Sequence, residues 1–167
     1  FRQEARDADG PAGAELLLRA GEFLERRLDR PEEAAVAYRE ALQKDPGLAP
    51  VERALERLFI ERSENEALVA LLRERALRSP PEIAAAVFDE IGRVHEEKTW
   101  DRPRAMAAYE EALRVVPGHP PSVRALDRLY AETGRTEELE HLRNEALADE
   151  DAPARGERLL RLARLRA

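Results

Sequence analysis

The sequence contains no cysteine among its 167 residues. Disulfide bonds and thiolate metal ligands are therefore excluded, while the redox compartment stays open. Long apolar runs are missing too. The longest, IAAAVF, covers only residues 83–88, whereas a helix that crosses a membrane needs about 20 apolar residues. We therefore predict no membrane insertion.

A surplus of basic residues is also absent, because 28 Lys and Arg face 35 Asp and Glu and give a formal net charge of −7. Proteins that bind nucleic acid usually carry a basic surplus that neutralises phosphates. We therefore predict no nucleic-acid partner. The sequence begins at Phe1 and ends in RLLRLARLRA, which we interpret as a piece of a longer protein, so its localisation stays open.

Residue patterns typical of catalysis or metal binding are scarce. His95 opens the stretch HEEKT, but Thr99 stands where a zinc protease places its second histidine. Glu138 and His141 have the spacing of a di-iron ligand pair, yet no matching copy lies on another helix. His119 is expected in a turn. Since no glycine-rich phosphate loop, Ser/His/Asp arrangement or distinct carboxylate pair is present, we predict no enzyme activity, no metal and no cofactor.

What the sequence does contain is a repeat with a period of 71 residues. Internal repeats of this kind are typical of arrays built from identical structural pieces. Gly21 falls on Gly92 when the chain is shifted by one period against itself. The longest matching stretches are AYREALQKDPG (37–47) with AYEEALRVVPG (108–118), and VERALERLF (51–59) with SVRALDRLY (122–130).

Each period is predicted to hold four helices, because apolar residues recur at spacings of three and four and no stretch alternates as a strand would. Asp29 is the expected cap of the second helix, and Asn65 and Thr136 are expected caps of fourth helices. Paired as hairpins of about 35 residues, these helices cannot bury their apolar faces alone and must stack. The predicted helices of the first period are 13–28, 31–44, 49–61 and 66–78.

These hairpins resemble tetratricopeptide repeats. In that family the first helix carries a Leu-Gly-like pair with an aromatic one turn later, and the second helix carries a small residue, an aromatic and an alanine before a proline. The resemblance implies an all-α, right-handed superhelical solenoid of antiparallel helix pairs. The residues that match the structural positions of the family are Gly21, Ala34, Tyr38, Ala41 and Pro46 in the first hairpin, and Gly92, Ala105, Tyr109, Ala112 and Pro117 in the third.

The resemblance sets the expected organisation of the chain. Strict and degenerate hairpins alternate, and the strict ones carry an extra residue around their turns. Two glycines inside helices would each cost about 1 kcal/mol relative to alanine, so we expect the paired helix to approach closely there. The expected segments are the end of a preceding repeat with a linker (1–12), repeat 1 (13–47), degenerate repeat 2 (48–80), repeat 3 (81–118), degenerate repeat 4 (119–152) and the first helix of a truncated repeat 5 (153–167).

A stripe of arginines gives the candidate binding site. In tetratricopeptide arrays the corresponding stripe of the first helices lines a concave groove that binds peptides or partner helices. Two interpretations are open. The arginines grip carboxylates of a partner, to which their planar guanidinium groups are suited, or they pair with Glu22, Glu25, Asp89 and Glu96 on adjacent helices and keep the groove solvated. The candidate residues are Arg53, Arg57, Arg93, Arg124 and Arg128.

The function that follows from the resemblance is that of a scaffold that binds a protein partner of unknown identity without chemistry of its own. Two alternatives stay open. The chain could self-assemble into a homo-oligomer through exposed end helices, where Leu159, Leu160 and Leu162 form an apolar face. It could instead recruit substrate for a larger enzyme whose catalytic domain lies outside this sequence.

Overall fold

The computed structural model describes residues 10–144, and every regular element in this range is an α-helix. The prediction of an all-α fold is therefore confirmed. The chain divides between Leu71 and Leu72 into two compact units, which we describe separately. The helices are α2 (Gly10–Leu28), α3 (Pro31–Lys44), α4 (Ala49–Glu61), α5 (Asn65–Arg78), α6 (Pro81–Glu97), α7 (Arg102–Val115) and α8 (Pro120–Thr133), and residues 136–144 are also helical.

The helix bounds lie close to those predicted, since prolines and glycines mark most of the ends. The bounds of α3 and α4 match the prediction, and α5 begins one residue early. The start of α2 differs more, because Gly10–Ala12, expected in a linker, form its first turn. Proline is suited to a first helical turn, where its missing N–H has no partner to lose. The rest of the predicted leading segment and the truncated repeat 5 lie outside the described residues.

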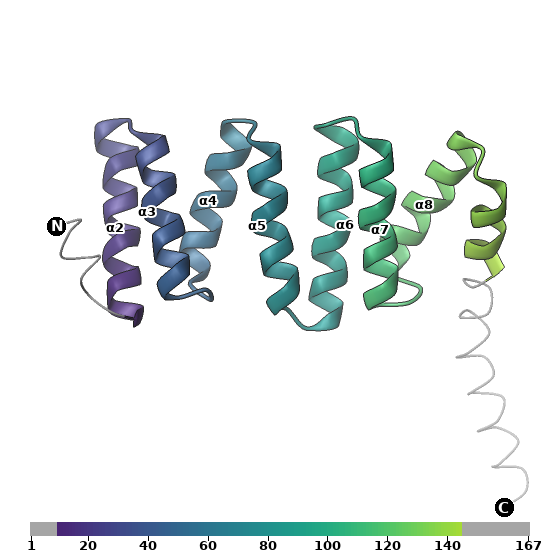
Figure 1. Ribbon diagram of the computed structural model, residues 1–167, viewed down its shortest axis with the longest axis horizontal. Coiled ribbons are helices and arrows are strands. Elements are labelled where there is room, and N and C mark those ends of the chain that lie inside the picture. Colours follow the sequence, from purple (N-terminus) through teal and green to yellow (C-terminus); the bar gives the residue numbers. More distant parts are fainter. Residues whose placement is uncertain (1–9, 145–167) are drawn as a thin grey trace, which may run out of the picture. The chain divides into compact units, whose positions relative to one another are not determined.

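In the first unit, α2 and α3 form an antiparallel hairpin and α3 also packs on α4 (Figure 1). Leu17 of α2 is fully buried, as are Ala34, Tyr38 and Ala41 of α3. From α4, Val51 and Leu55 complete this core with exposures of 0% and 1%. Small residues on α3 alternate with one large ring, which allows the two helices to lie close together.

The second unit repeats this packing with α6, α7 and α8 (Figure 1). Ala105, Tyr109 and Ala112 of α7 are buried at the positions equivalent to Ala34, Tyr38 and Ala41. Ala105 and Tyr109 belong to an apolar cluster that joins α7 to α8 and to the helical segment after it. Its buried members are Ala105, Met106, Tyr109, Leu126, Leu129, Tyr130 and Leu142.

The turns between paired helices come in two lengths. In the strict hairpins, the N–H of Arg30 donates to the Leu24 carbonyl and that of Asp101 to the His95 carbonyl, each at 2.9 Å and six residues back. In the degenerate hairpins the equivalent bonds reach back five residues, from Glu64 to Phe59 (2.8 Å) and from Arg135 to Tyr130 (2.9 Å). The extra residue expected in the strict hairpins is therefore accommodated in these turns.

Each turn needs one residue with a positive φ, and this overturns the predicted caps. Asp29 has φ 53° and lies in the turn, so it does not cap α3. Aspartate tolerates the left-handed region better than most residues, which explains its presence there. Trp100 takes the equivalent place with φ 57°. Asn65 begins α5 itself, and Thr136 likewise is already helical.

Asp101 supplies the side-chain cap of the second unit. Its Oδ1 accepts a hydrogen bond from the Arg104 N–H at 3.0 Å, which satisfies one of the free donors at the start of α7. The motif DRP occurs once in each period with a slip of one residue. Asp101 therefore reaches the cap position, whereas Asp29 falls one residue short of it.

The two helical glycines face the rings of the buried tyrosines. A Cβ added at Gly21 would lie 2.6 Å from Cδ1 of Tyr38, and one at Gly92 would lie 2.6 Å from Cζ of Tyr109. Real Cβ atoms do not come this close to an aromatic carbon, so the helices could not pair as they do with any other residue. Pro46 and Pro117, grouped with the packing positions by the resemblance, are exposed. They stand in the turns, where proline prevents the helix from continuing.

We predict that Gly21→Ala and Gly92→Ala each destabilise the fold by about 1–3 kcal/mol, because overpacking against a fully buried ring outweighs the higher helix propensity of alanine. Urea unfolding followed by circular dichroism measures this. Gly47→Ala is the matched control, because its added Cβ would meet only Asp45 Oδ1 at an ordinary 3.6 Å. Equal stability of the Gly21→Ala and Gly47→Ala variants would contradict the packing described above.

Candidate partner-binding groove

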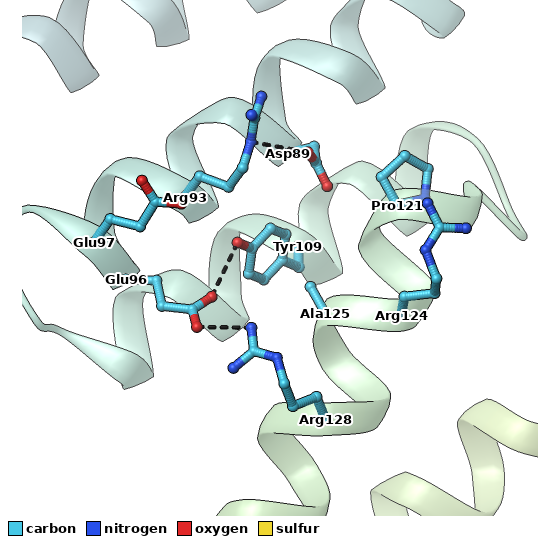
Figure 2. A pocket seen from close by; sticks show the side chains of 9 residues that line it. All are labelled: Asp89, Arg93, Glu96, Glu97, Tyr109, Pro121, Arg124, Ala125 and Arg128. Carbon is cyan, nitrogen blue, oxygen red and sulfur yellow. Dashed lines mark hydrogen bonds and ion pairs between the residues drawn. The ribbon is translucent and has the colours of Figure 1, made fainter.

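A pocket of about 250 Å³ opens in the second unit between α6 and α8, with Tyr109 of α7 behind it (Figure 2). Three of the predicted groove residues, Arg93, Arg124 and Arg128, meet in its lining. The pocket is thus charged rather than apolar. Its lining residues are Asp89, Arg93, Glu96, Glu97, Tyr109, Pro121, Arg124, Ala125 and Arg128.

Arg128 is already engaged within the chain. Its Nη2 lies 2.6 Å from Oε1 of Glu96, and Oε2 of the same carboxylate accepts a hydrogen bond from the Tyr109 hydroxyl at 3.2 Å (Figure 2). The bond to Glu96 raises the pKa of the Arg128 guanidinium, which stays charged. Glu132, one turn further along α8, lies 3.5 Å from Arg128 Nη1. Arg128 therefore links α8 to the hairpin of α6 and α7.

The first unit contains the same three-residue contact, with each position shifted by 71. Arg57 Nη2 lies 2.6 Å from Glu25 Oε1, and the Tyr38 hydroxyl donates to Glu25 Oε2 at 2.9 Å. The Glu25 side chain is 14% exposed. Two interpretations were open for the arginine stripe, contact with a partner or pairing within the chain. Arg57 and Arg128 pair within the chain, with a carboxylate of α2 and of α6 respectively.

Arg53 and Arg124 differ from the arginines one turn away. Both are exposed, and neither forms an ion pair within residues 10–144. Arg93 is intermediate, since its Nε lies 3.4 Å from Oδ2 of Asp89 on the same helix while 59% of its side chain is exposed. The stripe predicted from the sequence thus separates into arginines that pair with a carboxylate of another helix and arginines that have no such partner among the described residues.

A polar network beneath the pocket was not predicted. Ser122, which is fully buried, donates to Asp89 Oδ1 at 3.0 Å, and His119 Nδ1 lies 3.0 Å from the Ser122 oxygen. Because the serine hydroxyl donates to the carboxylate and is closed off from solvent, this is not the order of a catalytic triad. The sequence did differ between the two copies at these positions. The apolar Leu18 and Val51 of the first copy correspond to the polar Asp89 and Ser122 of the second.

The remaining candidates from the sequence do not form a site. His95 is 3% exposed, with Nδ1 3.3 Å from the Thr99 hydroxyl, so it belongs to the core. Glu138 pairs with Arg135 at 2.7 Å, and His141 is exposed on the same helical segment. In the part of the chain that the structure describes, no group of three potential ligands could hold a metal ion, and no helix is long and apolar enough to cross a membrane.

The tyrosines of both units predict a pH dependence. Burial raises the pKa of Tyr38, Tyr109 and Tyr130, and the neighbouring carboxylates Glu25, Glu96 and Glu110 raise it further. In the unfolded chain a tyrosine ionises near pH 10. Since the pKa in the folded state is higher, stability is complete below about pH 10 and falls as the pH rises above this value, where only the unfolded chain ionises.

We expect the tyrosinate absorbance of the folded chain to stay low at about pH 10.5, where the urea-unfolded chain has ionised more than half of its tyrosines. Near-ultraviolet difference spectra against pH, with and without urea, measure both states. The urea midpoint should move down over the same range. A native titration near pH 10 for all three tyrosines of the chain would contradict this account.

The Arg57–Glu25 pair should contribute measurable coupling. Because Arg57 is 42% exposed, solvent screening limits the effect, and we expect a coupling free energy of about 0.5–1 kcal/mol from a double-mutant cycle with Glu25→Gln and Arg57→Gln. Urea unfolding supplies the four stabilities. The Arg30–Glu33 pair, with exposures of 59% and 44%, is the control and should couple less. Coupling no larger than in this surface pair would mean that Arg57 does not fasten the helices.

Comparisons with known proteins address the fold. No family model matches the chain, and the curated proteins give no match. Among solved structures, the crystal structure of MamA has a TM-score of 0.52 and 20% identity over 85% of this chain and 81% of that chain. PilF from Pseudomonas aeruginosa has a TM-score of 0.44 and 18% identity, over 88% of this chain and 77% of that chain. A thermophilic TPR protein from Thermus thermophilus has a TM-score of 0.35 and 21% identity, over 84% of this chain and 76% of that chain. The chain thus shares with the MamA structure a fold of antiparallel helix pairs.

Proposed function

We propose that this chain is a protein-interaction scaffold that performs no chemistry and binds a segment of a protein partner at the groove face of a unit. The observation that carries the proposal is the division among the arginines. At two equivalent places one arginine pairs with a glutamate that also accepts a hydrogen bond from a tyrosine. The arginine one turn earlier is exposed and has no ion pair among the described residues.

The exposed arginines are suited to contacts with a partner. Arg53 and Arg124 each lie on the helix that follows a strict hairpin, one turn before the fixed arginines Arg57 and Arg128. A rigid neighbour limits how far such a side chain can move, which reduces the ordering cost on binding. Because guanidinium groups bind carboxylates through paired N–H donors, acidic groups of a partner are the expected ligands.

The surroundings of the pocket favour binding over catalysis. The Tyr109 hydroxyl donates to Glu96, whose carboxylate also pairs with Arg128, and the buried hydroxyl of Ser122 donates to Asp89. A general base needs a free proton-accepting atom in reach of a substrate. A role in which the chain recruits substrate for a catalytic domain elsewhere in a longer protein is compatible with the same groove.

Self-association is the second candidate function, and one observation favours it. Phe23 of α2 is 57% exposed, whereas Val94, at the equivalent position of α6, is 8% exposed. In a second copy of the chain, a helix could cover the Phe23 ring as the Val94 side chain is covered in α6. The end helices named above as a possible assembly surface lie outside the described residues.

The groove proposal is tested by the double variant Arg53→Glu with Arg124→Glu. We expect at least a roughly tenfold loss in affinity for the proteins that the native chain captures from a lysate, since one charge-reversed contact costs more than about 1.4 kcal/mol. The melting temperature should change little, because both side chains are exposed and make no ion pair among the described residues. Quantitative mass spectrometry of the captured proteins gives the readout.

Arg19→Glu with Arg73→Glu is the matched control, because these two arginines are equally exposed but do not occupy groove positions. This control should retain the captured proteins. If both double variants capture the same proteins in the same amounts, the groove is not the binding surface. Light scattering at several concentrations of the same samples separates loss of a partner from loss of self-association.

A further inference from the structure

The two groove faces carry their charges in opposite order. Along α2 the charges run Glu22 and then Arg26, while along α6 they run Arg93 and then Glu97 at the equivalent positions. The exposed arginine of the following helix, Arg53 or Arg124, is present in both copies. The fold and the fixed arginines are also shared, so the two faces differ in the order of charges that they present to a ligand.

In the second unit, Arg93 is held with part of its guanidinium free. Its Nε lies against Asp89 Oδ2 at 3.4 Å, while Asp89 Oδ1 accepts from the buried Ser122 at 3.0 Å. Asp89 is 8% exposed, so it acts as a fixed support beneath the pocket. The terminal nitrogens of Arg93 are left for another acceptor. Together with Arg124 on the facing helix, they provide two guanidinium groups on one pocket (Figure 2).

Glu97 lines the same pocket and is also available. It is exposed and makes no ion pair within the described range. On an α-helix, residues four apart are separated by a rise of about 6 Å, so Glu97 leaves the backbone about one turn beyond Arg93. A second acidic group of a ligand placed here would be repelled, whereas an ammonium or guanidinium group would be attracted.

Building on the proposed function, we infer that the α6–α8 pocket takes an extended segment of mixed charge. An acidic side chain of the partner lies between Arg93 and Arg124, and a basic side chain two residues away faces Glu97. In an extended chain, side chains at positions i and i+2 point the same way and lie about 6.5–7 Å apart. This spacing matches the rise of one helical turn on α6, so both contacts can form at once.

Uniformly charged segments fit the pocket less well. A run of acidic residues brings a second carboxylate against Glu97. A run of basic residues brings a positively charged group against Arg93 and Arg124. The α2 face does not duplicate this chemistry, since Glu22 stands at the position of Arg93 and the apolar Leu18 replaces Asp89 beneath it. The inference therefore concerns the second unit alone.

Three blocked peptides of equal length test the inference, each with Ser and Gly around a central Glu-Ser-Lys, Glu-Ser-Glu or Lys-Ser-Lys. We expect Glu-Ser-Lys to bind the native chain roughly fivefold more tightly than either uniform peptide, since two exposed ion pairs together contribute about 1 kcal/mol. Two-dimensional NMR titration measures dissociation constants in the millimolar range, and the shifted signals should lie on α6 and α8.

Variants that exchange residues between the copies sharpen the test. Glu97→Arg installs the residue that α2 carries at that position, and it should reverse the preference, so that Glu-Ser-Glu binds more tightly than Glu-Ser-Lys. Arg93→Gln, which keeps a donor but removes the charge, should abolish the preference for peptides that contain Glu. Both sites are exposed, and melting curves identify any variant that fails to fold.

The inference is overturned if the native chain binds Glu-Ser-Glu as tightly as Glu-Ser-Lys, if no peptide binds at millimolar concentration, or if Glu97→Arg leaves the order unchanged. Its failure is distinct from that of the proposed function. Should the Arg53/Arg124 reversal lose the captured proteins while the peptides show no preference, the scaffold role stands and the mixed-charge ligand is wrong. If the Arg53/Arg124 reversal keeps the captured proteins while the peptides show the expected preference, the mixed-charge ligand stands. The groove is then not the surface that binds those partners.

Discussion

The contact of a tyrosine ring with a helical glycine is the constraint on which the rest of each unit depends. Tyr38 and Tyr109 are buried to within 1% of their surface, and each lies against a glycine that leaves no room for a Cβ. This close approach places the tyrosine hydroxyl beside a glutamate of the first helix. The glutamate in turn reaches the arginine of the next helix, so the three helices are fastened by one ring and one carboxylate.

Arginines one turn apart on the same helix differ in their contacts. The arginine that meets the glutamate keeps the helices together, and its charge is already compensated. The earlier arginine is exposed and has no ion pair among the described residues. The paired arginine lies in a defined contact, and the exposed arginine projects from the same helix. The position that the exposed arginine offers to a ligand is therefore set by packing before binding. Such preorganisation lowers the ordering cost of association.

The helices could be predicted from the sequence because their ends carry proline and glycine and their faces carry regular apolar residues. The helix caps could not be predicted. Aspartate is common both at helix caps and at turn positions with a positive φ, and the length of the turn decides which of the two Asp29 occupies. The sequence also could not decide whether Arg57 and Arg128 contact a partner or pair within the chain. Several carboxylates lie on adjacent helices, and only the structure shows which of them each guanidinium group contacts. The Asp89–Ser122 contact was visible only as a mismatch between copies, whose meaning depends on α6 and α8 lying side by side.

That buried contact has a consequence for how such an array could change its length. Recombination between the two gene copies would add or remove 71 residues and leave the helices in register. A crossover that placed Val51 opposite Asp89 would bury a carboxylate without its hydroxyl donor, at a cost of about 1–3 kcal/mol. A crossover that placed Leu18 opposite Ser122 would strand the hydroxyl instead. Exchange between the copies is therefore least costly where α6 and α8 stay together, so that the polar pair is inherited as a block.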